Sequence, residues 1–177
     1  MVSLVVVFGM FVVLFAIMGG MRGWAKELLV TSAVVLGLFL NAILETYVES
    51  YSHAFSLQSE GAQFLMRGGL LALLVVFGYQ TPKLPILQDR VMRERLQDVL
   101  LGLVLGAVNG YLFVGSLWFY LHEAGYPTEL VSAPVLGSPL AEQVTKIMSG
   151  MPPNLLPIPQ VYFAVGVIFV FIIVVFV

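Results

Sequence analysis

Polar side chains inside long apolar stretches are the residues of this chain whose chemistry could carry a function. Asn109 lies near the middle of one such stretch and Asn41 lies in another. A buried amide seeks a hydrogen-bond partner on a neighbouring helix, so helix packing explains both residues. The alternative is that they line the polar path of a channel or transporter, together with the residues around Arg67. Arg67 lies about one turn inside its stretch, where we expect its side chain to reach the headgroups.

The residues that usually form catalytic or metal sites are few and scattered. His53 and His122 lie in or beside polar connections, which favours the headgroup zone over axial ligation of haem. The chain has no Cys, which excludes disulfides, thiolate metal sites and a cysteine nucleophile. We find no Ser, His and Asp set, no paired carboxylates within one segment and no phosphate-binding glycine loop. We therefore expect no catalytic residue, no metal and no cofactor, and interpret the protein as non-enzymatic.

Glycines at a spacing of four residues mark a surface where another helix can approach closely. The stretch around Asn109 contains Gly102, Gly106 and Gly110. A weaker version, with Gly37 and Asn41, occurs in the second apolar stretch. Small residues at this spacing let two helix backbones come together in a membrane. We expect the second and fourth apolar stretches to form a contact pair.

The elements that position these residues are long apolar stretches. Of 177 residues, 60% are hydrophobic and 10% are charged, which leaves too much apolar surface for a soluble domain of this size. Each stretch approaches the roughly 20 residues that a spanning helix needs. We therefore predict an all-α membrane protein with a single domain over 1–177. The predicted spans are 2–21, 28–47, 64–80, 99–121 and 160–177.

The basic residues give an orientation. Six of the eight Lys and Arg residues lie in the connections 22–27 and 82–98, and the positive-inside rule places these connections in the cytoplasm. The N-terminus is then outside and the C-terminus is cytoplasmic. Because the connection 22–27 is short, the first two helices should be antiparallel neighbours.

Two further segments have the periodicity of amphipathic helices. The segment 86–98 carries apolar residues on one face and arginines on the other, which is typical of an interfacial helix. The segment 139–150 follows Ser138, a helix-capping residue, and begins with Pro139. We expect this second helix to lie on the outer leaflet, with its apolar stripe in the lipid.

Two stretches of the sequence resemble the colicin V production protein family, CvpA. One is the turn from Met18 to Leu28, with Arg22, Gly23 and Glu27, and the other is the start of the fourth span, with Asp98 and Gly102. The resemblance covers about residues 2–150. The chain differs from the family pattern in lacking an Arg after Asp98, in having Asn109 where the family often has Arg, and in its extra apolar stretch.

The resemblance implies a protein of the bacterial inner membrane, related to toxin production or secretion, with no established reaction. The five motif residues above would then be family positions and not catalysts. We expect membrane lipids and membrane-protein partners or a homo-oligomer, and the net charge of −2 gives no reason to expect nucleic acid. One alternative is an accessory subunit of a larger complex, such as a respiratory or photosynthetic one. The other is a channel or transporter.

Overall fold

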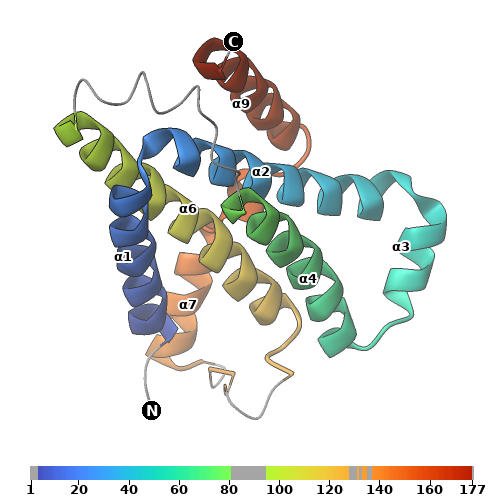
Figure 1. The fold of residues 1–177 in the computed structure, drawn as a ribbon. Coiled ribbons are helices and arrows are strands. Elements are labelled where there is room, and N and C mark those ends of the chain that lie inside the picture. Colours follow the sequence, from blue (N-terminus) through green and yellow to red (C-terminus); the bar gives the residue numbers. More distant parts are fainter. Residues whose placement is uncertain (1–3, 81–94, 128–130, 132, 135–136, 177) are drawn as a thin grey trace.

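The computed structural model describes residues 4–80, 95–127, 131, 133–134 and 137–176 (Figure 1). Helices make up nearly all of this part of the chain, which contains no strand. The helices are α1 (Leu4–Arg22), α2 (Trp24–Tyr47), α3 (Glu49–Ser56), α4 (Glu60–Tyr79), α6 (Arg95–Glu123), α7 (Pro139–Ser149), α8 (Pro152–Leu155) and α9 (Gln160–Phe176).

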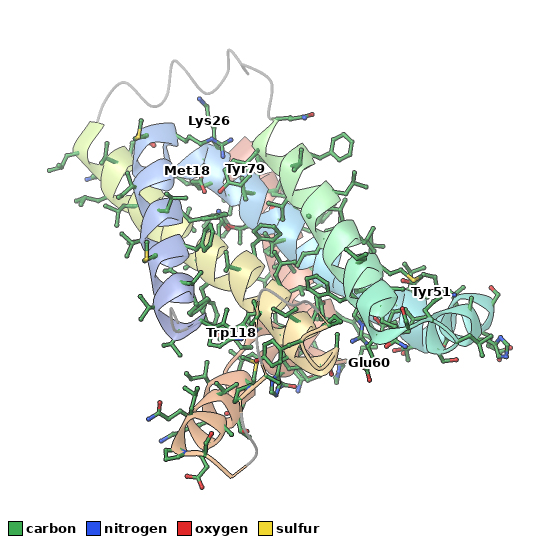
Figure 2. All side chains as sticks on the ribbon, turned by 90° about the horizontal axis from the view of Figure 1, so that it is seen from below. Met18, Lys26, Tyr51, Glu60, Tyr79 and Trp118 are labelled. Atoms are coloured by element: carbon green, nitrogen blue, oxygen red, sulfur yellow. The ribbon has the colours of Figure 1, made fainter. Side chains whose placement is uncertain are left out.

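Four helices, α1, α2, α4 and α6, are long and apolar enough to cross a membrane. This confirms the predicted class, an all-α membrane protein with several spans. The fifth predicted span, 160–177, is the 17-residue helix α9, which is apolar but shorter than the other four. Figure 2 shows the labelled Met18, Lys26 and Tyr79 near one end of the bundle and Tyr51, Glu60 and Trp118 toward the other.

The glycines of α6 bring this helix against α1. Gly102 and Gly106 both face Gly19, and Gly110 faces Val12 and Phe15. A Cβ atom at Gly106 would collide with the carbonyl oxygen of Phe15. Small residues permit this approach of two backbones. The glycine face therefore packs on the first span. The contact that we predicted between the second and fourth stretches also forms, since α2 packs against α6, but it does not involve these glycines.

The first two helices diverge from their turn, in contrast to the antiparallel pair that we predicted. Figure 1 shows α1 alongside α6, while α2 leads away from the turn toward α3. Both α1 and α2 pack chiefly on other helices, and α6 contacts the two of them. The short connection at Gly23 fixes where the helices meet, but the packing against α6 sets their directions.

The central helix of the bundle is α2, which packs against α4, α6 and α9. Gly37 meets Leu71 of α4, and so belongs to a different contact from the α6 glycines. The apolar core around α2 joins four helices. Its buried members are Val30, Val34, Leu38, Leu71, Val75, Tyr120 and Val161.

Two connections differ in structure from our predictions. The connection after α2 contains the helix α3, and Ser59 then caps α4 by accepting a hydrogen bond from the Ala62 amide at 3.4 Å. The predicted interfacial helix 86–98 lies largely outside the described residues. Its last positions, 95–98, form the first turn of α6.

The second amphipathic segment forms the helix α7, and part of its apolar stripe packs against the bundle. Ser138 caps it through the Ala141 amide at 3.2 Å, and the helix ends before Gly150. Val144 and Met148 are buried in a cluster with Trp118 of α6. Part of the apolar face of α7 is therefore covered by the bundle, where aromatic residues of α1 and α6 pack against it, while Leu140 at its start is 49% exposed.

The α1–α6 contact predicts different effects for the same substitution at two glycines. Gly106→Ala should lower stability by about 1–3 kcal/mol, because the new methyl group overpacks the contact with Phe15. Gly9→Ala is the matched control, since nothing lies within 4 Å of its Cβ position. Thermal unfolding of both variants in detergent measures the difference. Equal melting temperatures would contradict the close approach of the two helices.

Candidate functional site

Gly23 forms the turn between α1 and α2 and lies directly against Asp98 of α6. Its φ angle of 87° is in the region that favours glycine, and a Cβ atom there would lie 2.7 Å from the Asp98 Oδ2 atom. The backbone amide of Trp24 donates a hydrogen bond to Asp98 Oδ1 at 3.0 Å. Free amides and a positive dipole at a helix start attract a carboxylate. Asp98 thus caps α2 from another helix.

Glu27, one turn into α2, is fully buried, with 0% of its surface exposed. Its Oε1 atom lies 2.9 Å from an Arg22 guanidinium nitrogen, and its Oε2 atom accepts a hydrogen bond from the Asn109 Nδ2 atom at 2.8 Å. A carboxylate away from water is costly unless it is paired and hydrogen-bonded. Both oxygens of Glu27 have such partners.

Asn109 is also completely buried, and both ends of its amide are bonded to α2. Besides the Glu27 carboxylate, Nδ2 donates to the Glu27 backbone carbonyl at 3.0 Å. Its Oδ1 atom accepts from the Thr31 hydroxyl at 2.7 Å, and that hydroxyl also lies 3.0 Å from the Glu27 carbonyl. The side chain therefore ties the middle of α6 to the first turns of α2.

Arg22 extends the same network to α4. A second guanidinium nitrogen donates to the Tyr79 carbonyl at 3.2 Å, at the end of α4 where carbonyls lack helical partners. The guanidinium carbon lies 4.3 Å from the centre of the Tyr79 ring. Within the described residues, the buried Tyr79 hydroxyl has no hydrogen-bond partner. Because α1, α2, α4 and α6 all contribute, we call this cluster the Glu27 junction: Arg22, Gly23, Glu27, Thr31, Tyr79, Asp98, Gly102 and Asn109.

The structure brings together all five residues that carry the family resemblance. Arg22, Gly23, Glu27 and Asp98 interact as described above, and a Cβ atom at Gly102 would lie 3.2 Å from the Gly23 carbonyl carbon. Asn109 joins them, whereas Asn41 lies elsewhere. Its Nδ2 atom donates to the Arg67 carbonyl at 3.1 Å and lies 3.5 Å from the Tyr120 hydroxyl, and no group in the described part of the chain bonds to its Oδ1 atom.

Arg67, whose side chain we expected to reach the headgroups, is bound in a second ionic cluster. It binds both oxygens of Glu45 on α2, at 2.7 and 2.6 Å, and lies 2.6 Å from Glu123 on α6. Its guanidinium carbon also lies 4.8 Å from the centre of the Phe55 ring. Two carboxylates within reach make an inward orientation more favourable than an extended one. Near this cluster, the pKa of Tyr51 on α3 is raised, chiefly because the side chain is partly buried and secondly because the Glu45 carboxylate is close. The positive charge of Arg67 opposes this rise.

The two asparagines do not share a polar path. Along α2, Val34 and Leu38 lie between Thr31, which contacts Asn109, and Asn41. Val34 and Leu38 are buried in the apolar core around α2. The arrangement therefore separates the Glu27 junction from the Arg67 cluster by a layer of packed hydrocarbon.

Sequence reasoning missed several residues of these two clusters. We placed Glu27 in a connection, whereas it belongs to the buried part of α2, and we gave Thr31 and Tyr79 no role. Thr31 follows Glu27 by four positions and so shares its helix face, which was a usable signal. The sequence contained a weaker signal for the pairing of Arg67 with Glu45 and Glu123, since all three charges lie near span ends on the predicted outer side.

The described part of the chain has no group of three or more His, Asp or Glu side chains that could hold a metal ion. His122 is next to Tyr126, with its Nδ1 atom 3.1 Å from the hydroxyl oxygen, and not next to another ligand. The structure thus offers no arrangement in these residues that fits a bound metal.

Comparisons with models of known protein families, with curated proteins and with solved structures found no match for this chain.

The Glu27 junction predicts a large effect for Asn109→Leu. The substitution removes a hydrogen bond to a buried carboxylate and leaves Thr31 without its side-chain partner, so stability should fall by about 3 kcal/mol. Val108→Leu, at the neighbouring and partly exposed position, is the control and should behave as wild type. Thermal unfolding in detergent measures both. If Asn109→Leu has the same melting temperature as the wild-type protein, this hydrogen-bond network is not what stabilises the bundle.

Proposed function

We propose that this chain is a non-enzymatic membrane protein of the colicin V production type, which acts through helix packing, lipid headgroups and partner proteins. The observation that carries the proposal is the convergence of the motif residues. Trp24 and Asp98 are hydrogen-bonded although they are 74 positions apart in the sequence. Residues chosen for their resemblance to one family thus meet at one place in the fold, which favours a shared structural role.

The chemistry of the junction supports a structural role over catalysis. An acid–base catalyst needs a carboxylate or imidazole within reach of a substrate, and a nucleophile needs an adjacent base. Glu27 has both oxygens occupied by Arg22 and Asn109 and is fully buried. Asp98 is bonded to the start of α2. These groups fix four helices in one arrangement, which suits a rigid platform for other membrane components.

The resemblance also suggests the location, the bacterial inner membrane. The positive-inside rule then puts the end of the bundle that carries Arg22 and Lys26 in the cytoplasm. Glu49, Glu60 and His53, at or near α3, would face the outside. In this orientation the N-terminus is outside and the C-terminus is cytoplasmic.

A specific observation favours a second candidate function, an accessory subunit of a larger membrane complex. Figure 1 shows α9 leaving the bundle beyond α2. Val161 is the buried residue of this helix, while Phe163, Val167 and Val170 are each more than half exposed. An apolar helix with this little packing is suited to fill a lipid-facing gap in an assembly.

Restoration of toxin production tests the first proposal. In a bacterium that exports colicin V but lacks its own family member, we expect the wild-type chain to restore production. Asp98→Ala should reduce it, because the variant loses a helix cap worth about 1 kcal/mol at the motif junction. Glu142→Ala, an exposed carboxylate on α7, is the control and should restore production fully. Failure of well-expressed wild-type chain to restore it would sink the proposal.

Mild-detergent extraction from the native membrane separates the two candidates. Size separation followed by mass spectrometry should show a small homogeneous particle if the protein acts by itself or as a homo-oligomer. A large assembly of fixed stoichiometry would instead make it an accessory subunit. In that case, changing the exposed residues Phe163 and Val167 of α9 to polar ones should release it from the assembly.

A further inference from the structure

The chain leaves α6 through two residues with left-handed backbone. Gly125 has a φ angle of 63° and Tyr126 one of 59°, and the Tyr126 amide donates to the Leu121 carbonyl at 3.0 Å. Glycine adopts this conformation readily, but a tyrosine does so at a cost in free energy. The strained turn folds Tyr126 back onto the end of α6, where only 7% of its surface is exposed.

The Tyr126 hydroxyl contacts two side chains of α6, one of which can only donate a hydrogen bond while the other can accept one. The Trp118 indole nitrogen lies 3.4 Å away, and His122 Nδ1 lies 3.1 Å away on the other side. An indole N–H can only donate, so the hydroxyl oxygen accepts from Trp118. The hydroxyl proton is then left for Nδ1, which accepts it when the imidazole is neutral and carries its own proton on Nε2.

Protonation of the imidazole changes this chain of hydrogen bonds. Both nitrogens of an imidazolium are donors, so Nδ1 can no longer accept the Tyr126 proton and instead donates to the phenol oxygen, which then accepts from both Trp118 and His122. The Tyr126 proton would lose its acceptor in a buried position, which costs free energy. Burial raises the pKa of Tyr126, and the hydrogen bond from Trp118 opposes the rise. The phenol therefore stays protonated at neutral pH, and imidazole is the side-chain type of the trio whose protonation alters the hydrogen bonds.

Two of these three residues pack against α7. Tyr126 and Trp118 belong to one buried cluster with Val144 and Met148 of α7 and with Met151 just after it. The Tyr111 hydroxyl also donates to the Gly150 carbonyl at the end of α7. Trp118 is labelled in Figure 2, at the end of the bundle from which α7 extends. A rearrangement of Tyr126 would thus disturb the surface on which α7 rests.

We propose that Trp118, His122 and Tyr126 form a proton-sensitive latch that seats α7 on the bundle when His122 is neutral and releases it when His122 is protonated. Other charged groups also face this corner. On α4, Glu60 Oε2 lies 3.4 Å from the Cβ position of Gly125. On α6, Glu123 is bound to Arg67 of α4. Substitution of His122 separates an effect of the imidazole from an effect of these carboxylates.

Fluorescence of Trp118 tests the latch. The chain contains two tryptophans, so Trp24→Phe leaves Trp118 as the reporter. In this background the protein, purified in detergent, is titrated from about pH 8 to pH 5, the range of histidine protonation. We expect the emission maximum to shift to the red and acrylamide quenching to increase together, because release of α7 exposes the indole. His122→Gln keeps an acceptor but cannot be protonated, and should abolish the transition.

Two further variants complete the test. His53→Gln, at the other histidine of the chain, should leave the transition unchanged. Tyr126→Phe removes the central hydroxyl and should show the exposed Trp118 signal already at pH 8. The proposal is overturned if no transition occurs between pH 8 and pH 5, or if His122→Gln retains it. A change in intensity alone, with constant emission maximum and constant acrylamide quenching, would also overturn it, because it would mean that imidazolium quenches Trp118 while α7 stays in place.

Discussion

The burial of the Glu27 carboxylate is the constraint on which the rest of the bundle depends. A carboxylate without water needs a cation and hydrogen-bond donors, and losing any of them leaves an uncompensated charge. Arg22 supplies the cation from α1, and Asn109 supplies the donor from α6. Arg22 also bonds to the end of α4. One acidic side chain thus requires three other helices to be in their places, which makes the arrangement of the spans specific as well as stable.

The glycines make this arrangement sterically possible. Gly102 and Gly106 let α6 approach α1 at Gly19, so that Asp98 reaches the first amide of α2 and Asn109 reaches Glu27. In a membrane, apolar side chains alone do not select one neighbour over another, because lipid is as apolar as they are. Close backbone contact and a few buried polar groups therefore carry the specificity.

Sequence reasoning predicted the elements better than the contacts. The length and apolarity of the stretches gave the four spanning helices, and Ser138 with Pro139 gave the start of α7. Helix pairing was harder, because every face of a span is apolar and the pattern that distinguishes a buried side in water is missing. The glycine spacing revealed a contact face of α6 but not its partner. The inward turn of Arg67 could not be foreseen without knowing that Glu45 and Glu123 come together.

The two ionic clusters differ in a way that separates their roles. At the Glu27 junction the carboxylate is fully buried, so its charge is compensated by fixed neighbours and responds little to the surroundings. In the Arg67 cluster the Glu123 side chain is 44% exposed, and solvent and salt screen its interaction. Conformational change is therefore easier at the end of the bundle that carries the Arg67 cluster, and His122 and Tyr126 lie at that end. A helix seated there, α7, can move while the junction of the four spans stays intact.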